Sequence, residues 1–290
     1  MAFEYGVDSM AGRLSKVAVR KPTAILTADA AEWHYSKDLD SEGLVRQFTD
    51  FVALLEAAGS EVLWFDDYPD ELADSIFTYD PSFMLNDGAV LLRPGKEKRR
   101  GEVDVHRRFY ERLGIPIIGE VDASGTIEGG DCFWVNSSTL AVGKGFRTND
   151  AGISQLRNLV AAEGIDVLQF DLPYYKGPDA CLHLMSLVSP LSSDLAIVFE
   201  PLLPDGLAGT LKDFGFDLLR APEKEFNQSH GLSLNVLATA PREVIAIEGF
   251  PETHRLMAEA GCSVSLFDGD ELCIPCEGGP TCLTRPIQRV

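Results

Sequence analysis

The chain of 290 residues lacks several features that would indicate a special environment. It has no run of the roughly 18 apolar residues that a membrane span needs, and residues 1–19 hold no uninterrupted apolar segment typical of a secretion signal. Only six residues are cysteine, too few to suggest a disulfide framework without such a signal. These absences predict a cytoplasmic protein with no membrane partner.

Basic residues are also scarce relative to acidic ones. The chain has 25 Lys and Arg against 45 Asp and Glu, a formal net charge of -20. This excess argues against nucleic acid as a partner and weakly favours a cationic small molecule. No stretch is rich enough in Pro, Gly or Ser to separate two domains, and we expect a single domain over residues 1–290.

A repeat is the strongest pattern that the sequence does contain. Five stretches with helical spacing end in a glycine and continue into a short apolar strand, about every 50 residues. A glycine at a helix end favours the left-handed conformation that terminates the helix. The pattern predicts an α/β fold of five similar units around an axis, with a central site that every unit can reach. The five glycines are Gly59, Gly114, Gly164, Gly215 and Gly261.

Each unit is predicted to run strand, strand, helix, strand. The third unit shows this most clearly, with strands over 131–136 and 139–145, a helix over 149–163 and a last strand over 167–172. The first unit is the least regular, because a polar stretch over 25–40 precedes its helix. That stretch is long enough to be a functional loop, and we expect it to cover the central site.

Polar residues recur near the first strand of several units. Asp87 ends this strand in the second unit, Glu128 and Asp131 open it in the third, His183 opens it in the fourth, and Cys282 follows the fifth. Taken singly, these are typical of a turn carboxylate, a structural histidine and a buried thiol. Because the first strands are predicted to be innermost, the side chains could converge. A thiolate, an imidazole and carboxylates together suit covalent catalysis on a cationic carbon centre.

The pair Cys273 and Cys276 forms a second motif. A CxxC pair can hold zinc, but a structural zinc site needs four ligands, and neither a second CxxC nor an HxxxH follows. A CxxC redox pair normally lies at the start of a helix, and Glu277 with the glycines after it does not favour a helix there. We therefore predict no metal site.

Seven segments carry a resemblance to a known family. The pattern RPGxxxRRGE and the pattern GxRTN occur together, and the other five segments follow the family order over nearly the whole chain. On these segments the chain resembles the guanidine-modifying superfamily, and most of all its dimethylarginine dimethylaminohydrolases. The resemblance implies a five-bladed, pseudo-symmetric α/β propeller of ββαβ repeats around a central channel. The segments are AVRKP at 18–22, FMLND at 83–87, RPGKEKRRGE at 93–102, IEGGD at 127–131, GFRTN at 145–149, CLHLMS at 181–186 and GGPTCLT at 278–284.

The resemblance also implies roles for individual residues in the hydrolysis of an arginine derivative to citrulline and an amine. It implies a small cationic guanidino amino acid as substrate and a covalent intermediate on cysteine, with no metal or organic cofactor. A homodimer is compatible with it. The implied catalytic residues are Cys282, His183 and Glu128; Asp87 together with Glu128 would bind the guanidinium, Asp131 would assist or position His183, and Arg99 and Arg147 would bind the α-carboxylate.

Other functions of the same fold remain open from the sequence. Arginine deiminases have an aspartate two residues after the catalytic histidine, where this chain has Met185, and Asn86 and Pro81 also depart from the hydrolase pattern. An arginine dihydrolase or another guanidine hydrolase would process a different guanidine. An amidinotransferase would need a second substrate pocket. A non-catalytic binding protein of this fold would have no reason to keep Cys282, Glu128 and His183 together.

Overall fold

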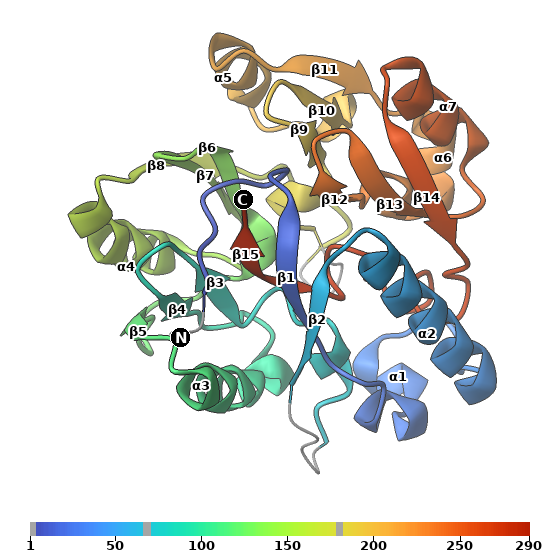
Figure 1. The fold of residues 1–290 in the computed structure, drawn as a ribbon, viewed down its shortest axis with the longest axis horizontal. Coiled ribbons are helices and arrows are strands. Elements are labelled where there is room, and N and C mark those ends of the chain that lie inside the picture. Colours follow the sequence, from blue (N-terminus) through green and yellow to red (C-terminus); the bar gives the residue numbers. More distant parts are fainter. Residues whose placement is uncertain (1–3, 66–70, 178–181) are drawn as a thin grey trace.

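Five small sheets surround a common axis, with helices at the rim (Figure 1). The computed structural model describes residues 4–65, 71–177 and 182–290. Cys181, in one of the matched segments, therefore lies outside the described residues. Each sheet has three strands. This confirms the predicted five-bladed α/β propeller.

Blades two to five share one topology. In each, the first two strands pair antiparallel and the last two pair parallel. A helix connects the parallel strands, as such a connection requires. The strands are β3 (Ser82–Met84), β4 (Ala89–Leu91) and β5 (Ile117–Glu120); β6 (Cys132–Asn136), β7 (Thr139–Lys144) and β8 (Asp166–Asp171); β9 (Val188–Ser192), β10 (Leu195–Val198) and β11 (Asp217–Arg220); and β12 (Leu237–Ala240), β13 (Glu243–Ile247) and β14 (Ser263–Phe267).

The rim helices end where the repeat predicts. All five repeat glycines have positive φ, between 69° and 92°, which a residue without Cβ adopts at little cost. A Cβ at any of them would meet nothing within 4 Å, so backbone conformation and not space explains the glycine. The connecting helices are α2 (Ser41–Ala57), α3 (Glu102–Leu113), α4 (Asp150–Val160), α5 (Leu207–Asp213) and α7 (Pro251–Glu259); α6 (Glu223–Gln228) lies between blades four and five.

Blade one is assembled from both ends of the chain. β1 (Leu14–Val19) pairs parallel with β2 (Glu61–Trp64), and its antiparallel partner is β15 (Arg285–Arg289). The sequence analysis did not anticipate β15, which closes the ring directly after Cys282. The polar stretch of the first unit folds into a 3-10 helix (Ala24–Thr27) and the short helix α1 (Ala30–Trp33) before α2 begins.

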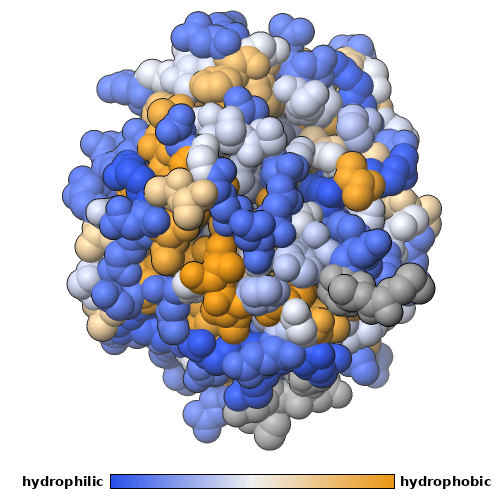
Figure 2. All heavy atoms as spheres, turned by 60° about the vertical axis from the view of Figure 1, so that its left-hand side comes forward, coloured by the Kyte–Doolittle hydropathy of each residue, from blue (hydrophilic) through white to orange (hydrophobic). Residues whose placement is uncertain are grey.

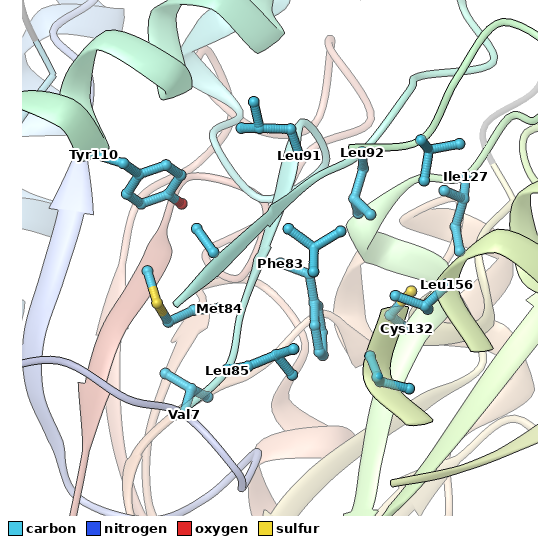
Figure 3. Close-up of a cluster of buried hydrophobic side chains, with 14 of the residues drawn as sticks. Val7, Phe83, Met84, Leu85, Leu91, Leu92, Tyr110, Ile127, Cys132 and Leu156 are labelled. Atoms are coloured by element: carbon cyan, nitrogen blue, oxygen red, sulfur yellow. The ribbon is translucent and has the colours of Figure 1, made fainter. Parts of the chain in front are cut away.

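The core lies between blades and around the axis. The strands β3, β9 and β12, each the first of its blade, are buried throughout, whereas the last strands β5, β8 and β11 are only half-buried. The first strands are therefore innermost, as predicted. Figure 3 shows one part of this core: Phe83 of blade two points toward Cys132 at the start of blade three, and Tyr110 of α3 lies on the other side of the blade-two strands.

One face of the molecule is largely polar (Figure 2). Figure 2 shows hydrophilic side chains over most of one face, interrupted by an apolar streak. No helix among the described residues is long and apolar enough to cross a membrane. The single domain, the cytoplasmic location and the homodimer stay predictions.

Candidate functional site

All five units contribute to one cavity near the axis. Its wall includes Trp33 from unit one, Asp80 from unit two, Arg147 from unit three, His183 from unit four and Cys282 after unit five. The space open to the centre of a water-sized sphere is about 60 Å³, and the cavity is partly open to solvent.

Glu128 and His183 form the best-defined pair at this cavity: His183 lines it, and Glu128 lies buried behind His183, outside the described lining, so its predicted contact with the guanidinium is not supported. Glu128 is fully buried, and its Oε2 lies 2.6 Å from His183 Nε2. Its Oε1 accepts hydrogen bonds from the backbone N–H groups of Gly95 and Lys96, at 2.9 and 3.3 Å. Burial raises the pKa of Glu128, but Arg147 and His183 outweigh burial and hold that pKa well below its usual range. A carboxylate that stays ionised can accept the Nε2–H of His183 and fix the orientation of its ring.

At two positions in the matched segments only glycine leaves enough room for a neighbouring residue of the site. A Cβ on Gly130 would lie 2.5 Å from His183 Nδ1, and a Cβ on Gly95 would lie 2.8 Å from the Cα of Arg147. Neither contact is possible for a real side chain. The IEGGD and RPG segments are therefore more than turns, because they bring backbone against the residues of the cavity.

Asp131 lies behind His183 and is absent from the described residues that line the cavity. Its Oδ1 accepts a hydrogen bond from the N–H of Leu184 at 2.9 Å, which ties the start of β6 to the segment that carries His183. Burial raises the pKa of Asp131 to about 6, against the opposing effects of His183 and the Thr148 hydroxyl. The predicted substrate contact is not supported; positioning of His183, the other predicted role, fits this geometry.

Asp87 is in the wrong place for its predicted role. It is exposed in the turn between β3 and β4, outside the described lining of the cavity, and its electrostatic neighbour is Glu163 at the end of the α4 segment. The aspartate next to β3 that does line the cavity is Asp80, two residues before the strand. The sequence analysis selected the aspartate after β3 instead of the one before it. Asp131 and His183 both precede the first strands of their blades, and the residue in the equivalent position of blade two is Asp80.

Arg99 also differs from its predicted role. Its side chain is 6% exposed, and its guanidinium donates to Asp80, Glu102 and the Phe77 carbonyl at 2.5–3.1 Å. Most of its five N–H groups are therefore already used inside the protein. This contradicts the expectation that Arg99 binds a substrate carboxylate. Arg99 instead holds Asp80 in place, together with the backbone N–H of Gly130, which donates to Asp80 Oδ1 at 2.9 Å.

Arg147 keeps a position that suits its predicted role. It lines the cavity, its side chain is 12% exposed, and its Nη1 lies 3.5 Å from both oxygens of Glu128. Lys96, which the sequence analysis did not select, adds a second cation to the same wall. The lining of this cavity therefore combines cations with the carboxylates of Asp74, Asp80 and Glu277.

Cys282 is held by a residue that the sequence analysis missed. Asn235 Nδ2 donates to Cys282 Sγ at 3.1 Å, and Asn235 Oδ1 accepts from the N–H of Thr281 at 3.1 Å. Asn235 is 9% exposed and lies just before β12. A single amide side chain in the mostly apolar segment LSLNVLAT was the signal that could have identified it.

The polar stretch of unit one forms part of the cavity wall. Trp33, His34 and Tyr35 line the cavity, and the Tyr35 hydroxyl donates to Asp74 at 2.8 Å. Lys96 Nζ pairs with the other oxygen of Asp74 at 2.6 Å and lies 5.2 Å from the centre of the Trp33 ring. These contacts dock the stretch over the cavity, as expected for a cover.

A second cavity reaches the same thiol and imidazole. It shares Asp80, His183, Glu277 and Cys282 with the first cavity. The two differ in charge, since the first contains Lys96, Arg99 and Arg147 and the described lining of the second contains no Lys or Arg. The carboxylates of Asp80 and Glu277 line both cavities, so it is the cations, present only in the described lining of the first, that distinguish the two.

Of the two thiols in the CxxC pair, Cys273 is buried and Cys276 is half-buried. Cys273 and Cys276 are free, and burial raises the pKa of both thiols. Among the residues that the structure describes, the one group with metal-ligand geometry is Asp80, Glu128 and His183, whose ligand atoms lie within 4.8 Å of one another. Backbone N–H groups, Arg99 and the His183–Glu128 pair already occupy most of its lone pairs. We therefore retain the prediction that no metal is bound.

Comparisons with known proteins identify the family and the fold of this chain. The sequence model of the arginine deiminase family matches residues 65–215, just over half of the chain. A dimethylarginine dimethylaminohydrolase from Streptomyces coelicolor is 30% identical over 276 residues, covering 95% of this chain and 98% of the relative.

Solved structures show the same fold at lower identity. A dimethylarginine dimethylaminohydrolase from Pseudomonas aeruginosa, a cysteine-to-serine mutant complexed with citrulline, superposes with a TM-score of 0.76 at 22% identity, covering 96% of this chain and 100% of the other. An amidinotransferase from Microseira wollei gives a TM-score of 0.79 at 17% identity, covering 98% and 97%. Hydrolases and a transferase therefore share this architecture.

Proposed function

The chain belongs to the arginine deiminase family of the guanidine-modifying superfamily, and from this we propose that it hydrolyses a methylated arginine to citrulline and an amine. It is a hydrolase that acts on carbon–nitrogen bonds of linear amidines. The finer part of the proposal, the methylarginine substrate, rests on the arrangement of charge and apolar surface around Cys282.

One observation carries the proposal. Cys282 and His183 line two cavities at once, and Asp80 faces both. A substrate that spans the two cavities would place its central carbon beside the thiol. Arginine derivatives have the matching charge order: an α-carboxylate at one end, a guanidinium several bonds away and, when methylated, an apolar substituent beyond it.

Asp80 is our candidate for binding the guanidinium. Each of its oxygens accepts one hydrogen bond, from Arg99 and from the Gly130 N–H, and a carboxylate oxygen can accept a second. A guanidinium presents parallel N–H groups that match a carboxylate in a bidentate manner. The α-carboxylate would then lie toward Arg147 and Lys96 in the first cavity.

In the proposed reaction the Cys282 thiolate attacks the guanidinium carbon and forms a carbon–sulfur bond. The imidazolium of His183 donates its proton to the substituted nitrogen, and the carbon–nitrogen bond breaks to release the amine. His183, now neutral, accepts a proton from water, and the resulting hydroxide adds to the same carbon. The carbon–sulfur bond then breaks, which returns the thiolate and leaves a ureido product.

The second cavity is our candidate for the leaving amine. Met185 and Leu232 provide apolar surface for N-methyl groups, and Glu277 provides a carboxylate for the ammonium that departs. Met185 stands where an arginine deiminase has an aspartate, and its thioether cannot accept strong hydrogen bonds from an unsubstituted guanidinium. This favours a methylated substrate over arginine itself.

The test is a product survey with arginine, monomethylarginine, dimethylarginine and agmatine, followed by mass spectrometry. We expect citrulline with methylamine or dimethylamine, and loss of at least about 10³-fold in kcat for Cys282→Ser. Cys276→Ser is the matched control, because this thiol lines the same first cavity. Ammonia from arginine alone would indicate a deiminase or dihydrolase, and transfer to an added amine would indicate a transferase. No turnover, or full activity in Cys282→Ser, would refute the proposal.

A further inference from the structure

A third cavity lies near the axis behind the candidate site. Tyr79, Met185 and Thr281 line both this cavity and the second one, so these three residues form the partition between them. Val7 and Phe83, labelled in Figure 3, form part of its apolar wall. The space open to the centre of a water-sized sphere is about 10 Å³, which is room for roughly one small particle.

Two buried N–H donors on this cavity have no acceptor among the described residues. They are Arg285 Nε and Trp134 Nε1, and both side chains line the cavity. Arg285 is 1% exposed and Trp134 is 3% exposed. A buried donor without a partner costs about 1–3 kcal/mol, so two on one small cavity need an explanation.

Arg285 cannot satisfy its Nε by moving toward solvent. Its Nη1 donates to the carbonyls of Tyr79 and Ser82, at 2.9 and 2.5 Å. Its guanidinium carbon also lies 4.3 Å from the centre of the Tyr79 ring, in a cation–π contact. The donor is therefore fixed beside the cavity.

The cavity also carries positive charge without a matching negative charge. Arg289 lines it, is 8% exposed, and donates through Nη1 to the Gly12 carbonyl at 2.5 Å. Neither Arg285 nor Arg289 forms an ion pair with any carboxylate of the described residues, and no Asp or Glu is among those that line the cavity. Burial, with the nearby charge of Arg285, lowers the pKa of Arg289 to about 10, although Tyr79 acts in the opposite direction.

We propose that this cavity binds a single halide ion, chloride in the cell. A monatomic anion supplies the missing negative charge and accepts hydrogen bonds from donors that arrive in unrelated directions, here Arg285 Nε and Trp134 Nε1. A phosphate or sulfate, with five heavy atoms, exceeds the space. A water molecule would fit, but it would bring no charge to two buried guanidinium groups. This site is separate from the proposed substrate cavities and does not depend on the proposed function.

The direct test uses bromide as the probe. Crystals soaked in sodium bromide should show an anomalous peak within hydrogen-bonding distance of Arg285 Nε and Trp134 Nε1. In solution, bromide should raise Tm in a saturable manner when sodium gluconate keeps the ionic strength constant, whereas sulfate at the same ionic strength should not.

Trp134→Phe removes one donor and keeps most of the ring. We expect it to weaken bromide binding about five-fold, the equivalent of one hydrogen bond of about 1 kcal/mol. Trp64→Phe is the matched control, because Trp64 is 38% exposed on β2 and should leave bromide affinity unchanged. If Trp134→Phe fails to fold, the anomalous map of the unaltered protein decides. An ordered water with no anomalous signal, or a Tm that responds to gluconate as to bromide, would overturn the inference.

Discussion

Replacing Arg99 with methionine separates two accounts of this residue. If Arg99 binds a substrate carboxylate, the change should weaken substrate binding and leave the fold intact. The structure predicts the opposite, because Asp80 and Glu102 would both stay buried without their cation, at side-chain exposures of 6% and 1%. Removing one partner of a buried ion pair costs about 3–5 kcal/mol. That is a large part of the stability of a typical domain.

The measurement is urea unfolding of the variant beside a matched control. With a slope of about 3 kcal/mol per molar urea, Arg99→Met should lower the midpoint by about 1 M or more. The control is Arg100→Met, since Arg100 pairs with the exposed Glu97 and its loss should cost less than about 1 kcal/mol. Adding Glu102→Gln to Arg99→Met should recover part of the loss, because it removes one of the two uncompensated charges.

Substrate discrimination gives the second readout. Wild-type protein should prefer methylarginine over its decarboxylated analogue, and Arg99→Met should keep this ratio even when kcat falls. Arg147→Met should reduce the ratio, because we assign the α-carboxylate to Arg147. An Arg99→Met protein with an unchanged urea midpoint and a lost preference would refute our account of Arg99.

Three further predictions follow from other carboxylates and from the thiol. Asp80→Asn should lower kcat/KM at least 100-fold, whereas Asp87→Asn should stay within about two-fold of wild type; steady-state kinetics decides, and equal losses would contradict the placement of Asp80. The folded-state pKa of Asp131, about 6, lies above its unfolded value. Protonated Asp131 therefore stabilises the fold at low pH, and this contribution is lost as the pH rises through 6. The urea midpoint of the unaltered protein should fall between pH 4.5 and 7 relative to that of Asp131→Asn. Parallel profiles of the two proteins would contradict this. Asn235→Ala should shift the alkylation of Cys282 by iodoacetamide to higher pH, because the thiolate loses a hydrogen-bond donor; an unshifted profile would exclude this role.

The sequence predicted the architecture well because the signals were local and repeated. Each glycine such as Gly114 needs the same left-handed cap, and each apolar strand after it repeats the same register, so the pattern is visible without tertiary knowledge. Strand β15 was missed for the opposite reason. Its partner β1 lies at the other end of the chain, and RPIQR contains two arginines that are buried only because the ring closes over them.

The convergence of residues near the axis could be predicted where the position of a residue in its blade decides whether it lies on the inner side. Glu128, His183 and Cys282 converge because each lies on an inner segment next to the axis. The exchange of Asp80 for Asp87 shows the limit of that reasoning, since two aspartates flank one short strand and only one end faces the cavity. The charge environment of Arg99 could not be read from spacing at all, because Asp80, Glu102 and the Phe77 carbonyl meet it only in the folded chain.

The closing strand of blade one has a consequence for biosynthesis. Cys282 lies three residues before β15, so the proposed nucleophile and the closing strand emerge from the ribosome together, after the other four blades. A nascent chain can therefore fold those four blades around an unfinished pocket that still lacks Cys282. Because β15 must find β1 across almost the whole chain, this last step should be slow relative to folding of the blades. Catalytic competence would then begin only when assembly is complete.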